Sequence, residues 1–279
     1  MADITRKEIE RRVNRREAVK EIDLTGLNLD EFNFQGAIFY KCKFSGSSMN
    51  LSNFAFSRFE GCLLNDCEIH ESHFQESSFF ECDFSKSTMR DSIFKEINFR
   101  QSILHATDLS GSFLENIILI DAQGELCDFS FSTFSESNLS RSKFQVCDFN
   151  SCQALGLTAD FADLTGSEFK GARMDNSNLK NSKLSFCNFD QASLQNCDIS
   201  NAKLMYAFLQ NSRLNSSNLK NVFLFGAKVS GSELKDTILE YTNLTKADFS
   251  QSILNGSKMN GVLDNETNYE GASLKGVTR

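Results

Sequence analysis

The sequence predicts an all-β solenoid, in which a chain winds through short, stacked coils. One large apolar residue recurs every five positions from Leu24 to Leu274, and 47 of these 51 positions hold Leu, Ile, Val, Phe, Met or Tyr. The position two residues earlier holds Ser, Ala, Cys or Thr in 43 of 51 cases. A period of five fits neither a helix nor a flat strand. A sustained short period is instead typical of solenoids, whose units bury their apolar faces only against neighbouring units.

Similar residues also recur at a spacing of 20, which predicts that four pentapeptides make one coil. Phenylalanine occupies positions 34, 54, 74 and 94, and also positions 39, 59, 79 and 99. The chain contains no proline. A stacked β-structure explains this absence, because most backbone N–H groups are needed for hydrogen bonds between coils and proline has none.

The order small residue, variable residue, large residue resembles the pentapeptide-repeat proteins from Ile22 to Leu274. The family prefers Asp or Asn before the central residue, as seen in Asn33-Phe34, Asp83-Phe84, Asp108-Leu109, Asn178-Leu179 and Asp248-Phe249. The resemblance implies a right-handed quadrilateral β-helix with one pentapeptide per side and about 13 coils. At about 4.8 Å per coil, such a solenoid would be about 60 Å long.

Residues 1–20 lie outside the repeat and predict an N-terminal α-helical cap, with the β-helix occupying residues 21–279. Thr5 followed by Glu8 is a capping-box pattern, and Ile9 and Val13 would share one helix face. Seven Lys or Arg against four Asp or Glu give this segment a charge of +3. We interpret it as a cover for an open strand edge, while a basic helix that touches nucleic acid or a membrane surface is the alternative.

The nine cysteines all fall in the small-residue column, where cysteine serves as a buried, unreactive small residue. Pairs such as Cys62 and Cys82 would stack one coil apart, which is close enough for the alternative of a disulfide or a shared metal ion. Thiols suit a reducing compartment. The charged segment Met1–Lys20 is unlike a signal peptide, and no apolar run reaches membrane length. The sequence therefore predicts a cytoplasmic protein, or one exported without a cleaved signal peptide, with no membrane association.

No catalytic constellation is visible in the sequence. The three histidines, His70, His73 and His105, do not form a metal-binding motif, and there is no Gly-rich phosphate loop, nucleophile elbow or zinc-spaced cluster. We therefore expect no enzyme activity, no cofactor and no metal.

Two outward-facing features are candidates for function, and the first is a column of acidic residues. Asp108, Asp128, Asp148 and Glu168 precede the central residue in consecutive coils. Carboxylates repeated at the strand spacing could imitate phosphates. The alternative is that Asp bonds the local backbone at this position, as in Asx turns.

The second feature is a group of aromatic residues, which we expect to form a fixed, nearly flat exposed array. It comprises Phe186, Tyr206, Phe208, Phe223 and Phe225. A smaller apolar group comprises Ile93, Phe113, Ile118 and Ile120. Contiguous exposed apolar patches mark partner sites, whereas scattered apolar residues do not.

These features predict a non-enzymatic, rigid scaffold for protein–protein interaction. The basic leader running into Asp23–Leu29 looks like pentapeptide-repeat proteins encoded with bacterial secretion systems, including type VI. The alternative from the same family is a DNA mimic that binds DNA gyrase or topoisomerase and protects or inhibits it. Residues after position 20 carry −11, against about 35 negative charges on duplex DNA of the same length. We expect no direct nucleic-acid binding.

The last coil, around Tyr269 and Leu274, is a competing interaction site. An uncovered strand edge there can pair with a second copy of the chain and form a homodimer.

Overall fold

The computed structural model describes residues 4–279 as two compact β-solenoid units. The first unit ends at Asn138, and the second extends from Leu139 to Arg279. The predicted class of fold is confirmed. The coil count differs from the prediction of about 13 coils in one uninterrupted solenoid. The structure instead has two units, and the first of them has about six coils.

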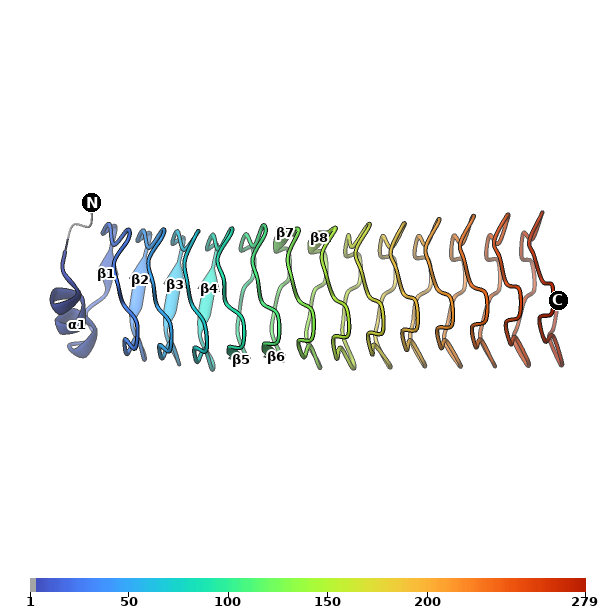
Figure 1. Ribbon diagram of the computed structural model, residues 1–279, viewed down its shortest axis with the longest axis horizontal. Coiled ribbons are helices and arrows are strands. Elements are labelled where there is room, and N and C mark those ends of the chain that lie inside the picture. Colours follow the sequence, from blue (N-terminus) through green and yellow to red (C-terminus); the bar gives the residue numbers. More distant parts are fainter. Residues whose placement is uncertain (1–3) are drawn as a thin grey trace. The chain divides into compact units, whose positions relative to one another are not determined.

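The first unit begins with a helix and continues in parallel β-structure (Figure 1). The elements of this unit are α1 (Arg6–Asn14), β1 (Val19–Lys20), β2 (Ile38–Tyr40), β3 (Arg58–Glu60), β4 (Ser78–Phe80), β5 (Ile93–Lys95), β6 (Phe113–Glu115) and β7 (Gln123–Glu125). Strands β1 to β4 form one parallel sheet, in which Phe39 pairs with Phe59 and Phe59 with Phe79. Strands β5 and β6 form a second parallel pair.

In the second unit, parallel pairing is made mostly by single residues. Its one strand is β8 (Lys143–Gln145). Lys183 pairs with Lys203, and Lys203 with Phe223, so the spacing is again 20 residues. The predicted 20-residue coil is therefore present in both units.

Each pentapeptide connects to the coils on both sides through its backbone. The N–H of the central residue Phe54 donates to the carbonyl of His73 in the next coil, with 2.7 Å between N and O. The N–H of the preceding Asn53 donates to the carbonyl of Phe32 in the previous coil, at 3.0 Å. The N–H of Phe56, two residues after the central position, also donates to the carbonyl of Gln75 in the next coil, at 2.9 Å. Because three N–H groups of this pentapeptide bond to neighbouring coils, proline has no place at these positions.

The core consists of the central residues and the small residues beside them. The central side chains from Leu24 to Met259 are buried. Buried serines of the small column satisfy their own hydroxyls: Ser72 donates to the carbonyl of Met49, at 3.2 Å. Cys67 makes the equivalent bond to the carbonyl of Phe44, at 3.1 Å. Small polar residues fit here because many of them reach a carbonyl one coil away, while others, such as Ser77, donate to the carbonyl three residues earlier.

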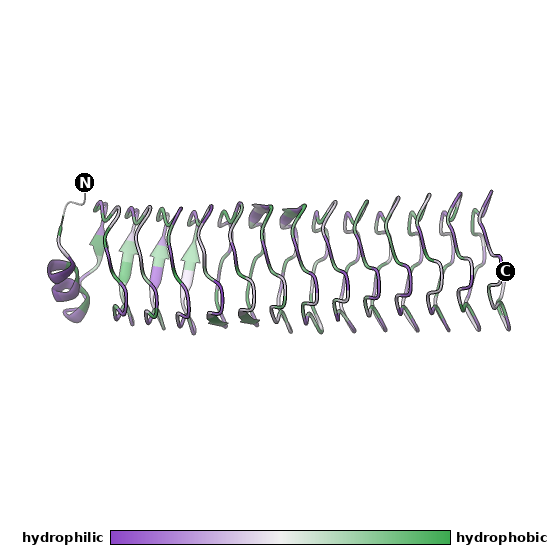
Figure 2. Cartoon of the chain, in the orientation of Figure 1, coloured by the Kyte–Doolittle hydropathy of each residue, from purple (hydrophilic) through white to green (hydrophobic). Residues whose placement is uncertain are grey.

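Helix α1 packs its apolar face inward and is otherwise strongly hydrophilic (Figure 2). Ile9 and Val13 are buried, as predicted. Thr5 accepts the N-terminal capping bond from the Glu8 backbone, at 3.4 Å. The Glu8 carboxylate does not complete the capping box, because it pairs with Arg11 (2.9 Å) and Arg12 (3.0 Å) instead.

Candidate functional site

The corners of the coils have an unusual backbone conformation. The residue two positions after each central residue has a φ angle near +60°. At many corners the N–H of the following residue donates to the central carbonyl. At the corner of Gly36, for example, Ala37 donates to Phe34 at 2.8 Å. Turns of this kind favour glycine or asparagine at the left-handed position.

Several corners nevertheless hold large apolar side chains, all of them exposed. These corner residues are Leu51, Phe56, Leu126 and Phe131 in the first unit, and Val146, Phe161, Phe186, Tyr206 and Tyr241 in the second. Such a side chain neither fills the core nor suits its backbone. The fold alone does not explain these residues.

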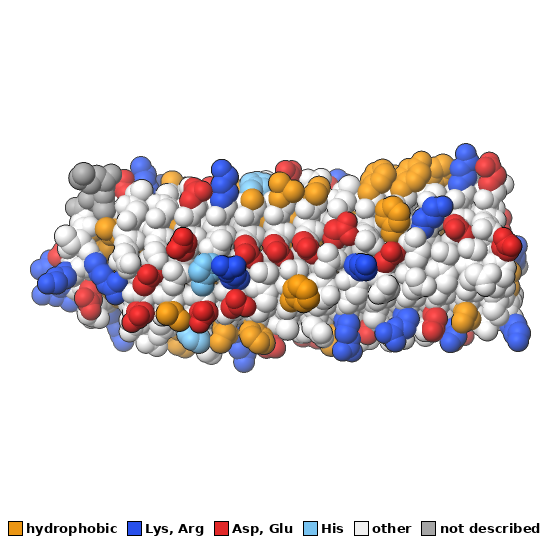
Figure 3. Space-filling model, viewed as in Figure 1, with side chains coloured by type: hydrophobic (Ala, Val, Ile, Leu, Met, Phe, Trp, Pro, Cys, Tyr) orange, Lys and Arg blue, Asp and Glu red, His pale blue; other side chains and the backbone are white. Residues whose placement is uncertain are grey.

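The predicted aromatic surface consists of Phe186, Tyr206, Phe208, Phe223 and Phe225, and all five lie in the second unit. Phe225 is half-buried, and the other four are exposed, with exposed fractions of 56% for Phe186, 46% for Tyr206, 44% for Phe208 and 47% for Phe223. Exposed hydrophobic side chains gather over the later coils of this unit in Figure 3. All five residues of the aromatic surface therefore belong to one unit, and four of them are exposed.

The aromatic surface is not flat, contrary to the prediction. The rings of Phe186 and Tyr206 stack with centroids 5.4 Å apart and an interplanar angle of 13°. The ring of Phe225 meets Tyr206 edge-on, at 5.5 Å and 85°. Aromatic pairs favour both geometries. The result is a stepped surface, with one ring standing across the stack.

Gly226 provides the space in which the Tyr206 ring lies. A Cβ atom at position 226 would be 2.7 Å from Cε1 of Tyr206, so close that the ring would have to shift. Gly166, at the equivalent corner three coils earlier, is not crowded, since its nearest neighbour would be Val146 at 3.6 Å. The orientation of Tyr206 therefore depends on glycine in the next coil.

Lysines occupy the columns on both sides of the aromatic surface. Lys183 and Lys203 precede Phe223 in one column, and Lys228 follows Phe208 in another. All three lysines are exposed. Lys183 pairs with Asp163, with 2.9 Å between Nζ and Oδ2.

The predicted acidic column is divided between the units, and its carboxylates bond locally. Asp108 accepts from the backbone and hydroxyl of Ser110, at 3.0 and 2.7 Å. Asp128 and Asp148 accept from the backbone N–H two residues later, at 2.9 and 2.8 Å. Glu168 accepts from the Asn188 amide, at 2.8 Å. The three aspartates thus make the bonds expected of Asx turns.

The smaller apolar group, Ile93, Phe113, Ile118 and Ile120, is divided between two adjacent sides of the coils. Ile93 and Phe113 pair across β5 and β6 and are exposed, and with Lys95 and Glu115 they line a pocket of about 230 Å³. Ile118 and Ile120 are half-buried and belong to the next pentapeptide. The four residues therefore do not form one surface.

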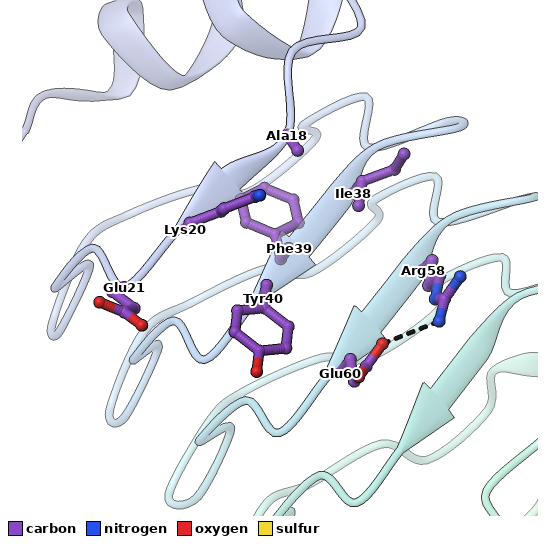
Figure 4. Close-up of a pocket in the computed structure, with 8 residues that line it drawn as sticks. All are labelled: Ala18, Lys20, Glu21, Ile38, Phe39, Tyr40, Arg58 and Glu60. Atoms are coloured by element: carbon purple, nitrogen blue, oxygen red, sulfur yellow. Dashed lines mark hydrogen bonds and ion pairs between the residues drawn. The ribbon is translucent and has the colours of Figure 1, made fainter.

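A larger groove, of about 640 Å³, lies over strands β1 to β3 (Figure 4). It is lined by Lys20, Glu21 and Tyr40, among others, and by an ion pair between Arg58 and Glu60 at 2.8 Å. Its lining mixes residues of both charges with apolar groups.

All nine cysteines are buried, and burial raises the pKa values of Cys152, Cys187 and Cys197 to about 12. Thiols of this kind are poor nucleophiles at neutral pH. No group of three or more metal-ligating side chains occurs within residues 4–279. Nor does that part of the chain contain a helix with the length and apolar character needed to cross a membrane.

The side chains of the predicted last-coil site, Tyr269 and Leu274, are partly exposed. Leu274 is 37% exposed and Tyr269 is half-buried, with the guanidinium of Arg279 5.6 Å from its ring centroid. Burial, together with the charge of Asp264, raises the pKa of Tyr269 to about 12.

The 20-residue coil and its five-residue columns define a class of protein, the repeat solenoids. The family model for pentapeptide repeats matches with eight copies, over residues 20–54, 82–121, 160–196, 182–221 and 217–256. The chain belongs to the pentapeptide-repeat family.

Several solved pentapeptide-repeat proteins resemble this chain. Rfr23 from the cyanobacterium Cyanothece 51142 is 26% identical over 40% of this chain and 63% of its own, with a TM-score of 0.31. HetL from Nostoc sp. strain PCC 7120, a protein involved in heterocyst differentiation regulation, is 19% identical over 96% of both chains, with a TM-score of 0.29. The fluoroquinolone resistance protein QnrB1 is 21% identical over 73% of this chain and 91% of its own, with a TM-score of 0.29. Comparison with curated proteins gave no match.

Proposed function

We propose that this protein is a non-enzymatic scaffold that binds a protein partner through the aromatic surface. The observation that carries the proposal is the pair Phe186 and Tyr206, two stacked rings at left-handed corners where they remain exposed. Rings fixed in this way lose little side-chain freedom on binding, and aromatic residues dominate interface energies.

The proposal is tested by replacing Phe186, Tyr206 and Phe208 together with Ser. The triple variant should keep nearly the stability of the parent protein but lose the partner captured from native lysate, since each hot-spot residue contributes about 2 kcal/mol or more. A double variant, Phe161→Ser with Tyr241→Ser, is the matched control, because both residues are exposed corner aromatics outside the surface. Retention of the same partner by the triple variant would overturn the proposal.

A narrower form of this proposal places the scaffold in a bacterial secretion system, as an accessory protein or effector. It is supported by the basic helix α1 leading into Asp23–Leu29. The same capture experiment distinguishes it, because the partner would then be a component of such a system.

The distribution of charge supports a second candidate function, the DNA mimic that binds gyrase. Residues 21–138 contain 7 Lys or Arg and 19 Asp or Glu, a net charge of −12, whereas residues 139–279 contain 15 and 14, a net charge of +1. At about 4.8 Å per coil, six coils span about 29 Å, and duplex DNA of that length carries about 17 negative charges. The acidic part is thus closer to DNA than the average over the whole chain suggests.

A gyrase supercoiling assay tests this second candidate. The intact protein should protect or inhibit gyrase at micromolar concentration, and replacing Asp108, Asp128 and Asp148 with Asn and Glu168 with Gln should abolish that effect. The Phe186, Tyr206 and Phe208 triple variant is the control, since it leaves every charge in place. An intact protein without effect on supercoiling removes the candidate.

A further inference from the structure

We infer that the aromatic surface binds an acidic peptide segment whose carboxylates alternate with apolar side chains. This inference rests on the proposed scaffold function and names the chemistry of its partner. It depends on the position of lysines around the rings rather than on the rings alone.

One lysine stands beside the rings without an acidic partner. Lys203 is exposed and pairs through the backbone with Phe223 in the next coil and with Lys183 in the previous one. Lys183 is already neutralised by Asp163. Within residues 4–279, no carboxylate lies within ion-pair distance of the Lys203 ammonium. Its charge is therefore available to a ligand lying on Phe223.

A second lysine stands on the other side of the rings. Lys228 is exposed and follows Phe208 by one coil, and its nearest acidic neighbour in that column is Asp248 in the following coil. The two residues do not come within ion-pair distance in the described part of the chain. The aromatic surface is consequently bordered by an exposed ammonium group on each of two sides.

This arrangement matches a peptide that has apolar side chains along its centre and carboxylates at its edges. The apolar side chains would cover the stacked and edge-on rings, and the carboxylates would reach Lys203 and Lys228. Opposite charges at the rim of an interface select the partner and speed association. Figure 3 shows Lys or Arg side chains close to the exposed hydrophobic side chains of the later coils.

A nucleic acid fits the surface less well, although aromatic rings with lysines also bind single strands. A single strand presents a phosphate at every nucleotide and needs a continuous basic groove. Here the columns that hold the lysines also hold Asp163, Glu168 and Asp248, so the basic charge is interrupted along the coils and forms no continuous groove in the described part of the chain.

The test begins with an unbiased selection. A library of random 12-residue peptides displayed on phage is panned against the intact full-length protein, with counter-selection on the Phe186, Tyr206 and Phe208 triple Ser variant. Enriched peptides should combine Asp or Glu with Leu, Phe or Trp. Their affinity, measured by fluorescence anisotropy, should weaken as NaCl rises from about 50 to about 500 mM, because screening acts on exposed charge pairs.

Charge reversal then identifies the lysines. Lys203→Glu with Lys228→Glu should lower the affinity of the enriched peptide at least about tenfold, which corresponds to about 1.4 kcal/mol. Lys143→Glu with Lys258→Glu is the matched control, because both are exposed lysines of the same unit and the change of net charge is equal. If the two double variants weaken binding equally, the effect is one of net charge and the inference is wrong.

A pair of glycine variants tests the ring orientation independently. Gly226→Ala should displace the Tyr206 ring and lower the affinity for the enriched peptide. Gly166→Ala imposes the same backbone strain without touching a ring, so it should leave the affinity unchanged. Equal affinities for both variants would contradict the role given to Tyr206.

The remaining outcomes separate this inference from the proposed function. Enrichment of basic or uncharged peptides that the triple variant fails to bind would overturn the inference and leave the scaffold standing. If a 12-nucleotide oligo(dT) binds more tightly than any peptide, the inference of a peptide ligand is wrong and the ligand is a nucleic acid. Light scattering that shows a dimer dissociated by the two Lys→Glu changes would make the occupant a second copy of the chain. If the triple variant binds everything that the parent protein binds, both the inference and the proposed function fail.

Discussion

Side chains at the corners of the coils stand on a backbone that L-amino acids adopt at a cost. The left-handed conformation costs roughly 1–2 kcal/mol for a residue with a Cβ atom, and asparagine or aspartate offset part of it with local hydrogen bonds. Phe161 has a φ of 58°, is exposed, and lies outside the aromatic surface. It therefore isolates the backbone contribution from any ring contact.

We predict that Phe161→Gly is more stable than Phe161→Ala by about 1 kcal/mol, because glycine adopts this conformation freely. Urea unfolding of the two variants measures the difference directly. Equal stability would mean that the corner is not strained. The same comparison at the buried Leu164, a central position, should give the opposite order.

Asp163 connects the stability of the second unit to pH. Burial by itself would raise the pKa of Asp163, but the hydrogen bonds from Lys183 and Thr165 lower it below its ordinary value. A folded-state pKa below the unfolded value, about 3.9, means that the ionised carboxylate stabilises the fold above that pH. This contribution is lost as the pH falls through the folded-state pKa.

We therefore expect Asp163→Asn to be less stable than the parent protein at pH 7 and to lose less stability on going to pH 3. Denaturant unfolding at the two pH values measures both effects. Lys183→Met should flatten the pH dependence in a similar way, since it removes the partner instead of the acid. An unchanged pH dependence in both variants would show that the pair contributes nothing to folding.

At the scale of an element, the first unit is built around a stack of phenylalanine rings. The centroids of Phe34 and Phe54 are 4.6 Å apart, and those of Phe54, Phe74 and Phe94 follow at 4.5 Å each. Interplanar angles of 10° or less make the rings nearly parallel. Every inner ring thus contacts one ring above and one below.

Removing one inner ring should leave a cavity that the rigid coils cannot close. We predict that Phe74→Ala costs about 3–5 kcal/mol of unfolding free energy. Phe113→Ala is the matched control, because Phe113 is 55% exposed, and its loss should cost within about 0.5 kcal/mol. Similar costs for the two changes would contradict the five-residue register.

Helix α1 contributes to the first unit through two kinds of contact. Its buried Ile9 and Val13 pack inward, and the Arg6 guanidinium donates to the carbonyls of Asn28 (3.4 Å) and Asp30 (2.8 Å). These carbonyls belong to the first coil, so α1 satisfies backbone groups that no preceding coil reaches.

The proposed capping role predicts that Ile9→Asp detaches α1 and exposes the edge of the first coil. Exposed edges associate, so size-exclusion chromatography with light scattering should show concentration-dependent oligomers. Glu10→Gln, an exposed position on the same helix, should remain like the parent protein. If the Ile9→Asp variant has the size and stability of the parent protein, α1 does not cap the first coil.

At the scale of the whole molecule, charge and exposed aromatics are distributed differently along the chain. Residues 21–138 carry a net charge of −12, whereas the aromatic surface lies in residues 139–279, whose net charge is +1. The scaffold candidate depends on residues 139–279, whereas most of the net negative charge that supports the DNA mimic lies in residues 21–138. Replacing Phe186, Tyr206 and Phe208 leaves every charge in place, so this triple variant can serve as the control in the supercoiling assay.

The five-residue period made the fold predictable from sequence, because one rule determines which residues are buried, how long a coil is and why proline is absent. Phe208 and Phe223 could also be found, since residues before a central position point outward. The orientation of Tyr206 could not, because it depends on a left-handed backbone and on the missing Cβ of Gly226. Exposed corner residues such as Phe131 were missed for the same reason, although an apolar residue two positions after a central one would have indicated them.

The register of exactly 20 residues between paired positions has a consequence for how such a chain can change in length. Duplicating or deleting one full coil within a unit keeps every column aligned and merely moves a surface along the stack. Inserting a single pentapeptide also preserves the buried pattern, yet it rotates everything after it by one side. If the insertion falls between Lys203 and Phe223, these two residues no longer share a column. Folding tolerates a step of five, whereas the proposed binding face keeps its arrangement only when coils are added or removed within it in steps of twenty.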